Sequence, residues 1–360
     1  MVRPFPARSK SLVMKRHIAL AALLTLTSTG LAEDPAGTFR VYVLAGQSNM
    51  EGKAQNVLLE HQAVDEKTRD QFAHLRDGDG WIVRDDVAVK FLGRHGGLTI
   101  GYGSPDRTGV ELEFGTVMGD AHDEPVLLIK TCWGGHSLYK LFRSPSSGLP
   151  EELLAADLEG QIKRVRNANE KNGKDDPLPT LEDIKQGYGR SYRNMLAEVA
   201  ATLASKDELF PSLKGKQPEL AGFVWFQGWN DMYNGAETEY ASNMRHFIQD
   251  VRRDLGAPDL PFVIGLMGQN MSKPAKGPML VIQQAQLSME TLPEFKGNVK
   301  AVRTDVLVDE AAEALYPSWK DRFEEWQKTG SDHPYHYLGS ALWFNRMGRA
   351  FGEAMLELEG

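Results

Sequence analysis

The sequence has a single cysteine, no excess of positive charge and no long hydrophobic run. Cys132 is the only cysteine in 360 residues, which excludes an internal disulfide. The 41 lysine and arginine residues are outnumbered by 49 aspartate and glutamate residues, and the net charge is -8. Nucleic acid and anionic membrane surfaces bind basic patches, so we expect neither as a partner. No later stretch is apolar for long enough to give stable membrane insertion.

The first 32 residues have the order of segments that is typical of a secretory signal peptide. Basic residues lie between Arg3 and Arg16, a short apolar run follows over 18–26, and small residues lead up to Ala32. This order predicts cleavage after Ala32 and a secreted or periplasmic mature protein, with an uncleaved membrane tether as the alternative. Residues 33–360 contain no internal repeat and no linker, so we expect them to form a single domain.

Beyond the signal segment, short apolar runs alternate with longer segments of helical periodicity. This pattern predicts an α/β protein with a mostly parallel sheet that helices cover on both faces. Residues 81–92 mix apolar and charged positions and indicate a hairpin or an insertion. The predicted strands are 39–44, 125–131, 222–226, 261–267 and 299–306, and the predicted helices are 110–119, 151–172, 181–205, 239–255, 281–290 and 342–358.

Polar motifs follow three of these strands, and a fourth motif precedes the last helix. They are Gly-Gln-Ser-Asn-Met at 46–50, Trp-Gly-Gly-His-Ser at 133–137, Gln-Gly-Trp-Asn-Asp at 227–231 and Ser-Asp-His-Pro-Tyr-His-Tyr at 331–337. Ligand sites of parallel sheets lie at the carboxyl ends of strands. Each motif alone could be a capped turn or a surface feature. Together they supply the nucleophile, base, acid and oxyanion donors of a serine hydrolase.

Ser48 is the predicted nucleophile, although it does not lie in the Gly-x-Ser-x-Gly elbow of the α/β-hydrolases. Cys132 is the other candidate, because it directly precedes a tryptophan and two glycines. It also closely follows the apolar run 126–129, where cysteines are usually buried and inert. We therefore interpret Cys132 as a structural residue.

The four motifs, in this order, resemble those of the SGNH hydrolases. The similarity rests on Gly-Gln-Ser-Asn-Met, on the Gly134–Gly135 turn, on Trp225-x-Gln227-Gly228 and on the late Asp-His segment, and it extends over residues 39–350. The most similar branch is that of the carbohydrate esterases related to sialate O-acetylesterase. The resemblance implies a flavodoxin-like three-layer α/β/α sandwich without metal or cofactor. It also implies acetyl esters of sugars, on sialic acids or polysaccharides, as substrates.

The same resemblance implies roles for the residues that match. Ser48 would be the nucleophile, His336 the base and Asp332 the acid that orients the base. The family usually places two residues between that acid and base, whereas three separate Asp332 from His336. His333 is the alternative base, but Pro334 biases it toward an extended conformation.

The expected oxyanion donors are the backbone N–H groups of Ser48 and Gly135 and the side-chain amide of Gln227. Gln227 directly follows a strand, whereas Asn230 lies further out, although it stands in the Gly-x-Asn-Asp block that supplies this donor in much of the superfamily. We expect substrate contacts from residues beside these motifs, namely Gln47, Asn49, Trp133, Asn230 and Asp231.

These inferences predict a carboxylic ester hydrolase that removes O-acetyl groups from carbohydrates through an acyl-enzyme. An inactive carbohydrate-binding protein on the same scaffold is one alternative, because Trp229 stands where such esterases often have glutamate. A lipid or thioester hydrolase is the other, since fold does not determine substrate.

Overall fold

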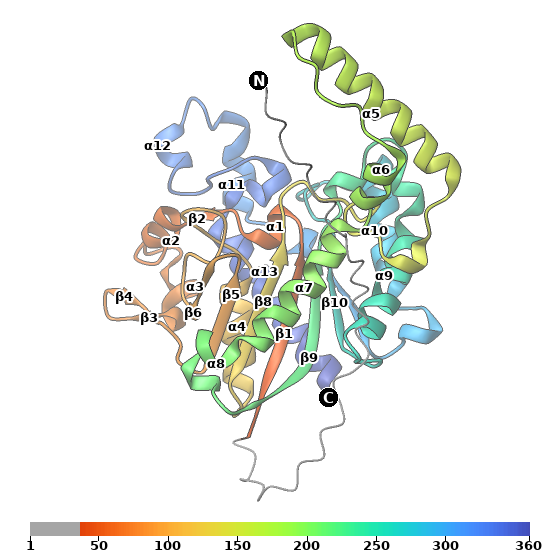
Figure 1. Ribbon diagram of the computed structural model, residues 1–360. Coiled ribbons are helices and arrows are strands. Elements are labelled where there is room, and N and C mark those ends of the chain that lie inside the picture. Colours follow the sequence, from red (N-terminus) through yellow and green to blue (C-terminus); the bar gives the residue numbers. More distant parts are fainter. Residues whose placement is uncertain (1–36) are drawn as a thin grey trace, which may run out of the picture. The chain divides into compact units, whose positions relative to one another are not determined.

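The computed structural model describes residues 37–360 (Figure 1), so the expected signal peptide at 1–32 lies outside the described residues. A seven-stranded sheet has the order β11-β10-β9-β1-β8-β5-β6, and its neighbours are parallel except for the pair β5–β6. Its strands are β1 (Thr38–Gly46), β5 (Val87–Phe91), β6 (Arg94–Gly97), β8 (Val126–Cys132), β9 (Gln217–Phe226), β10 (Phe262–Gly265) and β11 (Val299–Val302). Two short ribbons pair β2 (Ala54–Gln55) with β7 (Arg107–Thr108) and β3 (Arg76–Asp77) with β4 (Gly80–Trp81).

Helices cover both faces of the sheet, which gives the expected three layers (Figure 1). One face carries α4 (Glu111–Ala121) and α13 (Ala341–Glu359), and the other carries α7 (Arg190–Ala204), α9 (Tyr240–Asp254) and α10 (Gly277–Met289). The remaining α-helices are α1 (Ser48–Glu51), α2 (Asn56–Gln62), α3 (Arg69–Phe72), α5 (Glu151–Asn172), α6 (Leu181–Gly187), α8 (Lys206–Leu209), α11 (Glu310–Leu315) and α12 (Phe323–Trp326). Within residues 37–360, no helix is both long and apolar enough to cross a membrane.

The apolar character of the strands follows from burial on both faces. In β1, Tyr42 and Leu44 belong to the hydrophobic cluster beneath α4 and α13, whereas Val41 and Val43 belong to the cluster beneath α7, α9 and α10. Successive side chains of a strand point to opposite faces, so a strand between two helical layers needs apolar residues at every position. This is why an apolar run predicts β1.

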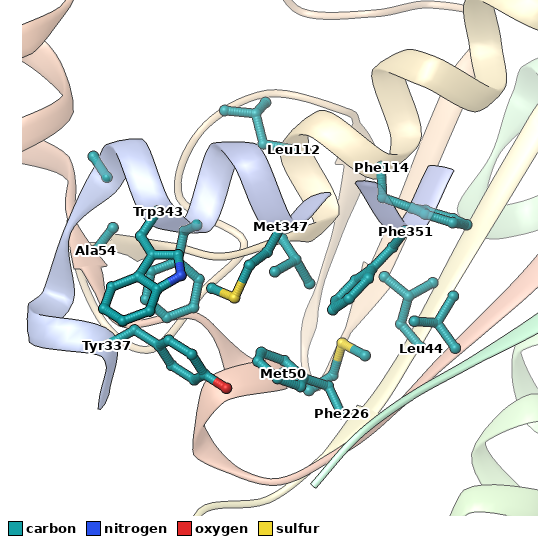
Figure 2. Packing of buried hydrophobic residues seen from close by; sticks show 14 of the residues in the cluster. Leu44, Met50, Ala54, Leu112, Phe114, Phe226, Tyr337, Trp343, Met347 and Phe351 are labelled. Atoms are coloured by element: carbon teal, nitrogen blue, oxygen red, sulfur yellow. The ribbon is translucent and has the colours of Figure 1, made fainter. Parts of the chain in front are cut away.

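The core beneath α13 also fixes two segments that matter for the site. Trp343, Met347 and Phe351 lie on successive turns of α13 and face the same cluster as Met50 and Tyr337 (Figure 2). Met50 stands two residues after the predicted nucleophile, and Tyr337 directly follows the predicted base. Packing of these two side chains therefore anchors both candidate catalytic segments.

The structure departs from the predicted elements in two places. The expected helix over 181–205 is two helices, α6 and α7, because Gly189 adopts a left-handed conformation with φ of 65° between them. The expected strand over 299–306 ends at Val302 as β11, because residues 304–306 form the 3-10 helix η7 (Thr304–Val306). The segment 81–92 contains β5, which forms the expected hairpin with β6 and pairs in parallel with β8. The predicted helix over 151–172 coincides with α5.

Candidate active site

Ser48 lies at the carboxyl edge of the sheet, where β1 passes directly into the short helix α1. The turn is tight at Gly46, because a Cβ built there would meet the carbonyl oxygen of Phe226 at 2.2 Å. Only glycine permits this approach of the two backbones. The Ser48 side chain is almost buried, with 7% exposure.

Ser48, His336 and Asp332 form a chain of side chains across this edge. The Nε2 atom of His336 lies 3.1 Å from Oγ of Ser48, which is hydrogen-bond distance. The Nδ1 atom of His336 lies 3.1 Å from Oδ2 of Asp332. This second pair is within ion-pair distance, although the ring is not aligned for a well-formed hydrogen bond. The ring of His333 does not contact Ser48. Its Nδ1 lies 2.9 Å from the hydroxyl of Tyr316 instead.

The carboxylate of Asp332 is surrounded by donors. Arg107 donates to its Oδ2 over 2.7 Å, and the backbone N–H of His333 donates to its Oδ1 over 2.8 Å. Burial alone would raise the pKa of Asp332, but the interactions with His336, His333 and Arg107 outweigh it and hold the pKa well below its usual range. Asp332 is therefore ionised at neutral pH and can stabilise a positively charged imidazole.

A tight loop accommodates the extra residue between Asp332 and His336. The backbone N–H of Asp332 donates to the carbonyl of Leu338, and that of Leu338 donates to the carbonyl of His333. Tyr337 and Leu338 both have positive φ, at 52° and 59°, in the 3-10 helix η9 (Pro334–Gly339). Non-glycine residues adopt this conformation only where their surroundings enforce it. Here both side chains are fully buried.

The loop after β8 brings Gly134 and Gly135 to the same edge. The N–H of Gly134 donates to Oε1 of Glu51, and Oε2 of the same carboxylate accepts from Lys53 and Ser104. Burial would raise the pKa of Glu51, but these hydrogen bonds lower it overall. Gly135 adopts φ of 78°, and within residues 37–360 its N–H and that of Ser48 have no hydrogen-bond partner. Both groups are available to a ligand.

Gln227 does not have the free amide that the sequence predicts. Its Nε2 donates to the carbonyl of His136 over 3.1 Å and to Oδ2 of Asp231 over 2.6 Å. Its Oε1 accepts from the hydroxyl of Tyr240 over 3.2 Å, and the side chain is buried. Because both amide protons are bonded within the protein, the structure contradicts the expectation that Gln227 donates to a substrate oxygen.

Asn230 has a free side-chain amide, which Gln227 does not have. It lies in the 3-10 helix η4 (Trp229–Asp231) and is half-buried. Its Nδ2 is 4.0 Å from the position that a Cβ on Gly135 would occupy. Among the described residues its side chain has no hydrogen-bond partner, and its amide lies close to Gly135, whose N–H is also free.

Three of the expected substrate contacts instead hold the loops together. Oε1 of Gln47 accepts from the N–H of Gly228 over 3.3 Å, and Nδ2 of Asn49 donates to the carbonyl of Tyr335 over 3.1 Å. Asp231 is fully buried and accepts, besides the Gln227 amide, the N–H groups of Leu138 and Tyr139 over 2.9 and 2.7 Å. Because these side chains are buried and take part in bonds within the protein, the structure gives their contact with a substrate no support.

Trp133 remains a candidate for substrate contact. It is half-buried and stacks on the ring of His136 with the ring centres 5.9 Å apart. Cys132 is fully buried, and burial raises the pKa of its thiol. It is therefore a structural residue and not a nucleophile. In the described part of the chain, no group of three or more histidine, cysteine or acidic side chains is arranged to hold a metal ion.

Sequence reasoning does not identify Arg107 and Glu51 as parts of the site. Glu51 directly follows the Gly-Gln-Ser-Asn-Met motif, so its position beside the nucleophile is a signal that could have drawn attention to it. Arg107 belongs to the two-residue strand β7 and lies 225 positions before Asp332. Nothing in the sequence around Arg107 links it to that carboxylate.

A parallel α/β sheet that carries a serine, a histidine and an aspartate in contact at one edge has the arrangement of a serine hydrolase. The family described as carbohydrate esterase, sialic acid-specific acetylesterase matches residues 38–174 and 179–313. The match spans most of the chain, and the protein belongs to this family. It includes Ser48 and Asn230 and ends before Asp332 and His336.

Solved structures similar to this chain have low sequence identity. A protein of Arabidopsis thaliana is 14% identical with a TM-score of 0.48, and the alignment covers 89% of this chain and 98% of that one. A carbohydrate acetylesterase from Xanthomonas citri is 15% identical with a TM-score of 0.42, covering 87% and 55%. The protein NanS is 13% identical with a TM-score of 0.39, covering 76% and 79%. No curated protein matches the chain.

Proposed function

We propose that this protein is a serine esterase that removes O-acetyl groups from carbohydrates. The observation that carries the proposal is the contact of 3.1 Å between Oγ of Ser48 and Nε2 of His336, with Asp332 at the other ring nitrogen. A serine beside a histidine that an acid orients is the arrangement that activates a hydroxyl for attack on an ester. Membership of a carbohydrate esterase family supports an acetylated sugar as the substrate.

The reaction would proceed in two steps. Oγ of Ser48 attacks the acetyl carbonyl carbon while His336 takes the hydroxyl proton. The bond from that carbon to the sugar oxygen then breaks, and His336 returns the proton to the sugar. In the second step water gives a proton to His336 and attacks the carbonyl carbon of the acetyl-enzyme. The bond from that carbon to Oγ of Ser48 then breaks, and His336 returns the proton to Oγ, which releases acetate and restores Ser48. Asp332 remains ionised throughout and stabilises the imidazolium.

Three donors would hold the oxyanion that forms in each step. The N–H groups of Ser48 and Gly135 are free of partners within the described chain, and the Asn230 amide lies beside Gly135. One such donor is typically worth about 3 kcal/mol of barrier. Asn230 takes the role that the sequence assigns to Gln227.

The test compares wild type with Ser48→Ala on acetylated sugars, on 4-nitrophenyl acetate and on longer acyl esters and thioesters. We expect wild type to release acetate from the sugars and from 4-nitrophenyl acetate, and Ser48→Ala to fold normally without activity. Equal activity of Ser48→Ala and wild type would show that Ser48 is not the nucleophile. Faster turnover of long acyl esters or thioesters would favour a lipid or thioester hydrolase. Sugar binding by the wild type without turnover would favour the inactive binding protein.

We also propose that the protein is exported after cleavage behind Ala32. The basic, apolar and small-residue segments of 1–32 support this proposal. N-terminal sequencing of the protein from a Gram-negative expression host is the test. An N-terminus at Glu33 in the periplasm or medium is expected, whereas a cytoplasmic protein that begins at Met1 would contradict it.

A further inference from the structure

A cavity of about 720 Å³ opens beside Asn230. Its walls come from the segment after Gly135, from the segment between Asn230 and Ala236, from Tyr188 and from one face of α5. We infer that this cavity binds the carbohydrate chain that carries the acetyl group, so that the substrate is an oligosaccharide or polysaccharide and not a single acetylated sugar. The inference rests on the proposed esterase function and deepens it.

The cavity shares Asn230 with the candidate active site. Ser137 and Tyr139 line it and follow Gly135 by two and four residues, and Asn230 is itself part of the wall. Both loops that hold the proposed oxyanion donors therefore extend directly into the cavity. An ester held at Ser48 has its carbonyl oxygen at these donors, and the cavity begins at Asn230, where it offers space for the rest of a sugar chain. Its volume lies well within the range of about 300–1,000 Å³ of ligand sites.

The lining has the mixed chemistry that a sugar chain requires. Tyr139 and Tyr233 offer aromatic rings for the apolar faces of sugar rings, and the amide of Asn234 can bond hydroxyl groups. Tyr233 is 52% exposed, and among the described residues its side chain has no hydrogen-bond or ring partner. A large aromatic side chain left free at the rim of a cavity is typical of a binding surface.

Of the three charged side chains of the lining, Lys140 and Asp157 neutralise each other, and Arg164 leaves a single positive charge at the exposed side. Lys140 forms an ion pair with Asp157, and its ammonium group lies 5.0 Å from the ring centre of Tyr188. Both groups keep hydrogen-bonding capacity without a strong net charge. This part of the cavity therefore suits hydroxyl groups.

Helix α5 contributes little to the main core, and one of its faces is therefore free to line a binding site. Of its 22 residues only Leu154 is buried, in a small cluster with Ile184 and Tyr188 that is separate from the two large cores. Figure 1 shows α5 extending beside α6, away from the sheet. Leu153, Asp157, Gly160 and Arg164 are spaced by three or four residues, so one face of the helix lines the cavity.

Gly160 marks the open part of this face. Glycine inside a helix carries a cost in stability relative to alanine. No contact within the described structure explains that cost, since a Cβ built at Gly160 would meet no atom within 4 Å. The missing side chain leaves room for a ligand, and a large side chain at this position would fill the cavity without a clash in the protein.

The experiment fills the cavity with Gly160→Phe and uses Ala155→Phe as the matched control, because Ala155 is exposed on α5 and does not line the cavity. Substrates are chemically acetylated xylose and glucose oligomers from mono- to tetrasaccharide, with 4-nitrophenyl acetate as the small ester. In wild type and Ala155→Phe, kcat/KM should rise roughly tenfold or more with chain length, the effect of about 1.4 kcal/mol of added binding. Gly160→Phe should abolish this rise and leave 4-nitrophenyl acetate hydrolysis unchanged. Tyr233→Ala should reduce the rise of kcat/KM with chain length.

Equal kcat/KM for all chain lengths in wild type, or an unchanged rise in Gly160→Phe, would overturn the inference and leave the esterase proposal intact. Failure of wild type to hydrolyse any of these esters would overturn the esterase proposal. Calorimetry on Ser48→Ala with the unacetylated tetrasaccharides then tests the cavity by itself. Binding that Gly160→Phe removes and Ala155→Phe retains supports the cavity, and absence of binding overturns it.

Discussion

Arg107 donates to Oδ2 of Asp332 over 2.7 Å, and the same oxygen lies 3.1 Å from the ring of His336. One carboxylate oxygen therefore faces both a permanent positive charge and the base. The guanidinium helps to keep the pKa of Asp332 below its usual range, against the effect of burial. Arg107 thus acts on the reaction through Asp332, as a positioning residue.

The first prediction is that Arg107→Ala shifts the acid limb of the pH–activity profile upward. Removing the guanidinium raises the pKa of Asp332, since one of the interactions that lowers it is lost. As the pH falls, Asp332 then becomes protonated earlier than in wild type and ceases to stabilise the His336 imidazolium. We expect the kcat/KM profile of Arg107→Ala on 4-nitrophenyl acetate to lose activity at a higher pH on its acid side than that of wild type, with a smaller loss near pH 8.

Arg107→Lys is the matched control because it keeps the charge without the fork of the guanidinium. Its profile should lie between those of wild type and Arg107→Ala. A uniform loss at all pH values in Arg107→Ala would indicate that Arg107 supports only the local structure. Identical pH profiles of Arg107→Ala and wild type would contradict any effect of Arg107 on the reaction through Asp332.

The second prediction separates Asn230 from Gln227. Asn230→Ala removes the side-chain donor proposed for the oxyanion, so kcat should fall by roughly 10²–10³ while KM changes little. The free energy of unfolding should hardly change, because the Asn230 side chain makes no hydrogen bond within the described residues. Steady-state kinetics on 4-nitrophenyl acetate and thermal melts provide the two measurements.

Gln227→Ala should show a strong loss of stability. The substitution leaves the buried carboxylate of Asp231 and the carbonyl of His136 without one of their donors, whereas the hydroxyl of Tyr240 keeps the backbone carbonyl of residue 227 as an acceptor. Buried polar groups without partners cost about 1–3 kcal/mol each. Unchanged stability together with a selective loss of kcat would instead restore Gln227 as the oxyanion donor.

The fold was largely predictable because β1, β8, β9 and β10 are buried on both faces and must be apolar throughout. The ends of α5 were predictable because Pro150 precedes the helix and Gly173 follows it in a left-handed conformation with φ of 61°. The break at Gly189 was missed because helical periodicity continues on both sides of it.

Residues of the site that directly follow strands could be predicted from the sequence. The directions in which the side chains of the site point could not. Ser48 and Gly135 follow β1 and β8, which lie side by side. The direction of the Gln227 amide was not predictable, since it depends on Asp231 turning back beneath it in η4. Arg107 was missed because only the tertiary fold brings it to Asp332.

The third prediction concerns Glu51, which holds the loop of Gly134. Glu51→Ala removes the acceptor for the Gly134 N–H and the partner of Lys53. The neighbouring N–H of Gly135 then loses its fixed direction, so we expect kcat on 4-nitrophenyl acetate to fall about tenfold with little change in KM. Glu51→Gln keeps one acceptor oxygen and should recover part of the activity. An effect on KM alone would contradict positioning of the oxyanion loop.

The last prediction concerns the ion pair of Lys130 and Glu111 beneath the site. Both side chains are fully buried, and Nζ of Lys130 donates to Oε2 of Glu111 over 2.8 Å. The same Nζ donates to the carbonyls of Glu51 and Tyr102 over 2.9 and 2.7 Å. The pair therefore ties β8 to the helix that carries the nucleophile.

Lys130→Met should destabilise the protein by about 3–5 kcal/mol, because it leaves the Glu111 carboxylate buried without its counter-charge. The double variant Lys130→Met/Glu111→Leu removes both charges and should be more stable than the single variant in urea denaturation. Both variants should also lose kcat, since the carbonyl of Glu51 has lost its donor in each. If the double variant were less stable than Lys130→Met, the cost would lie in lost packing and not in an unpaired charge.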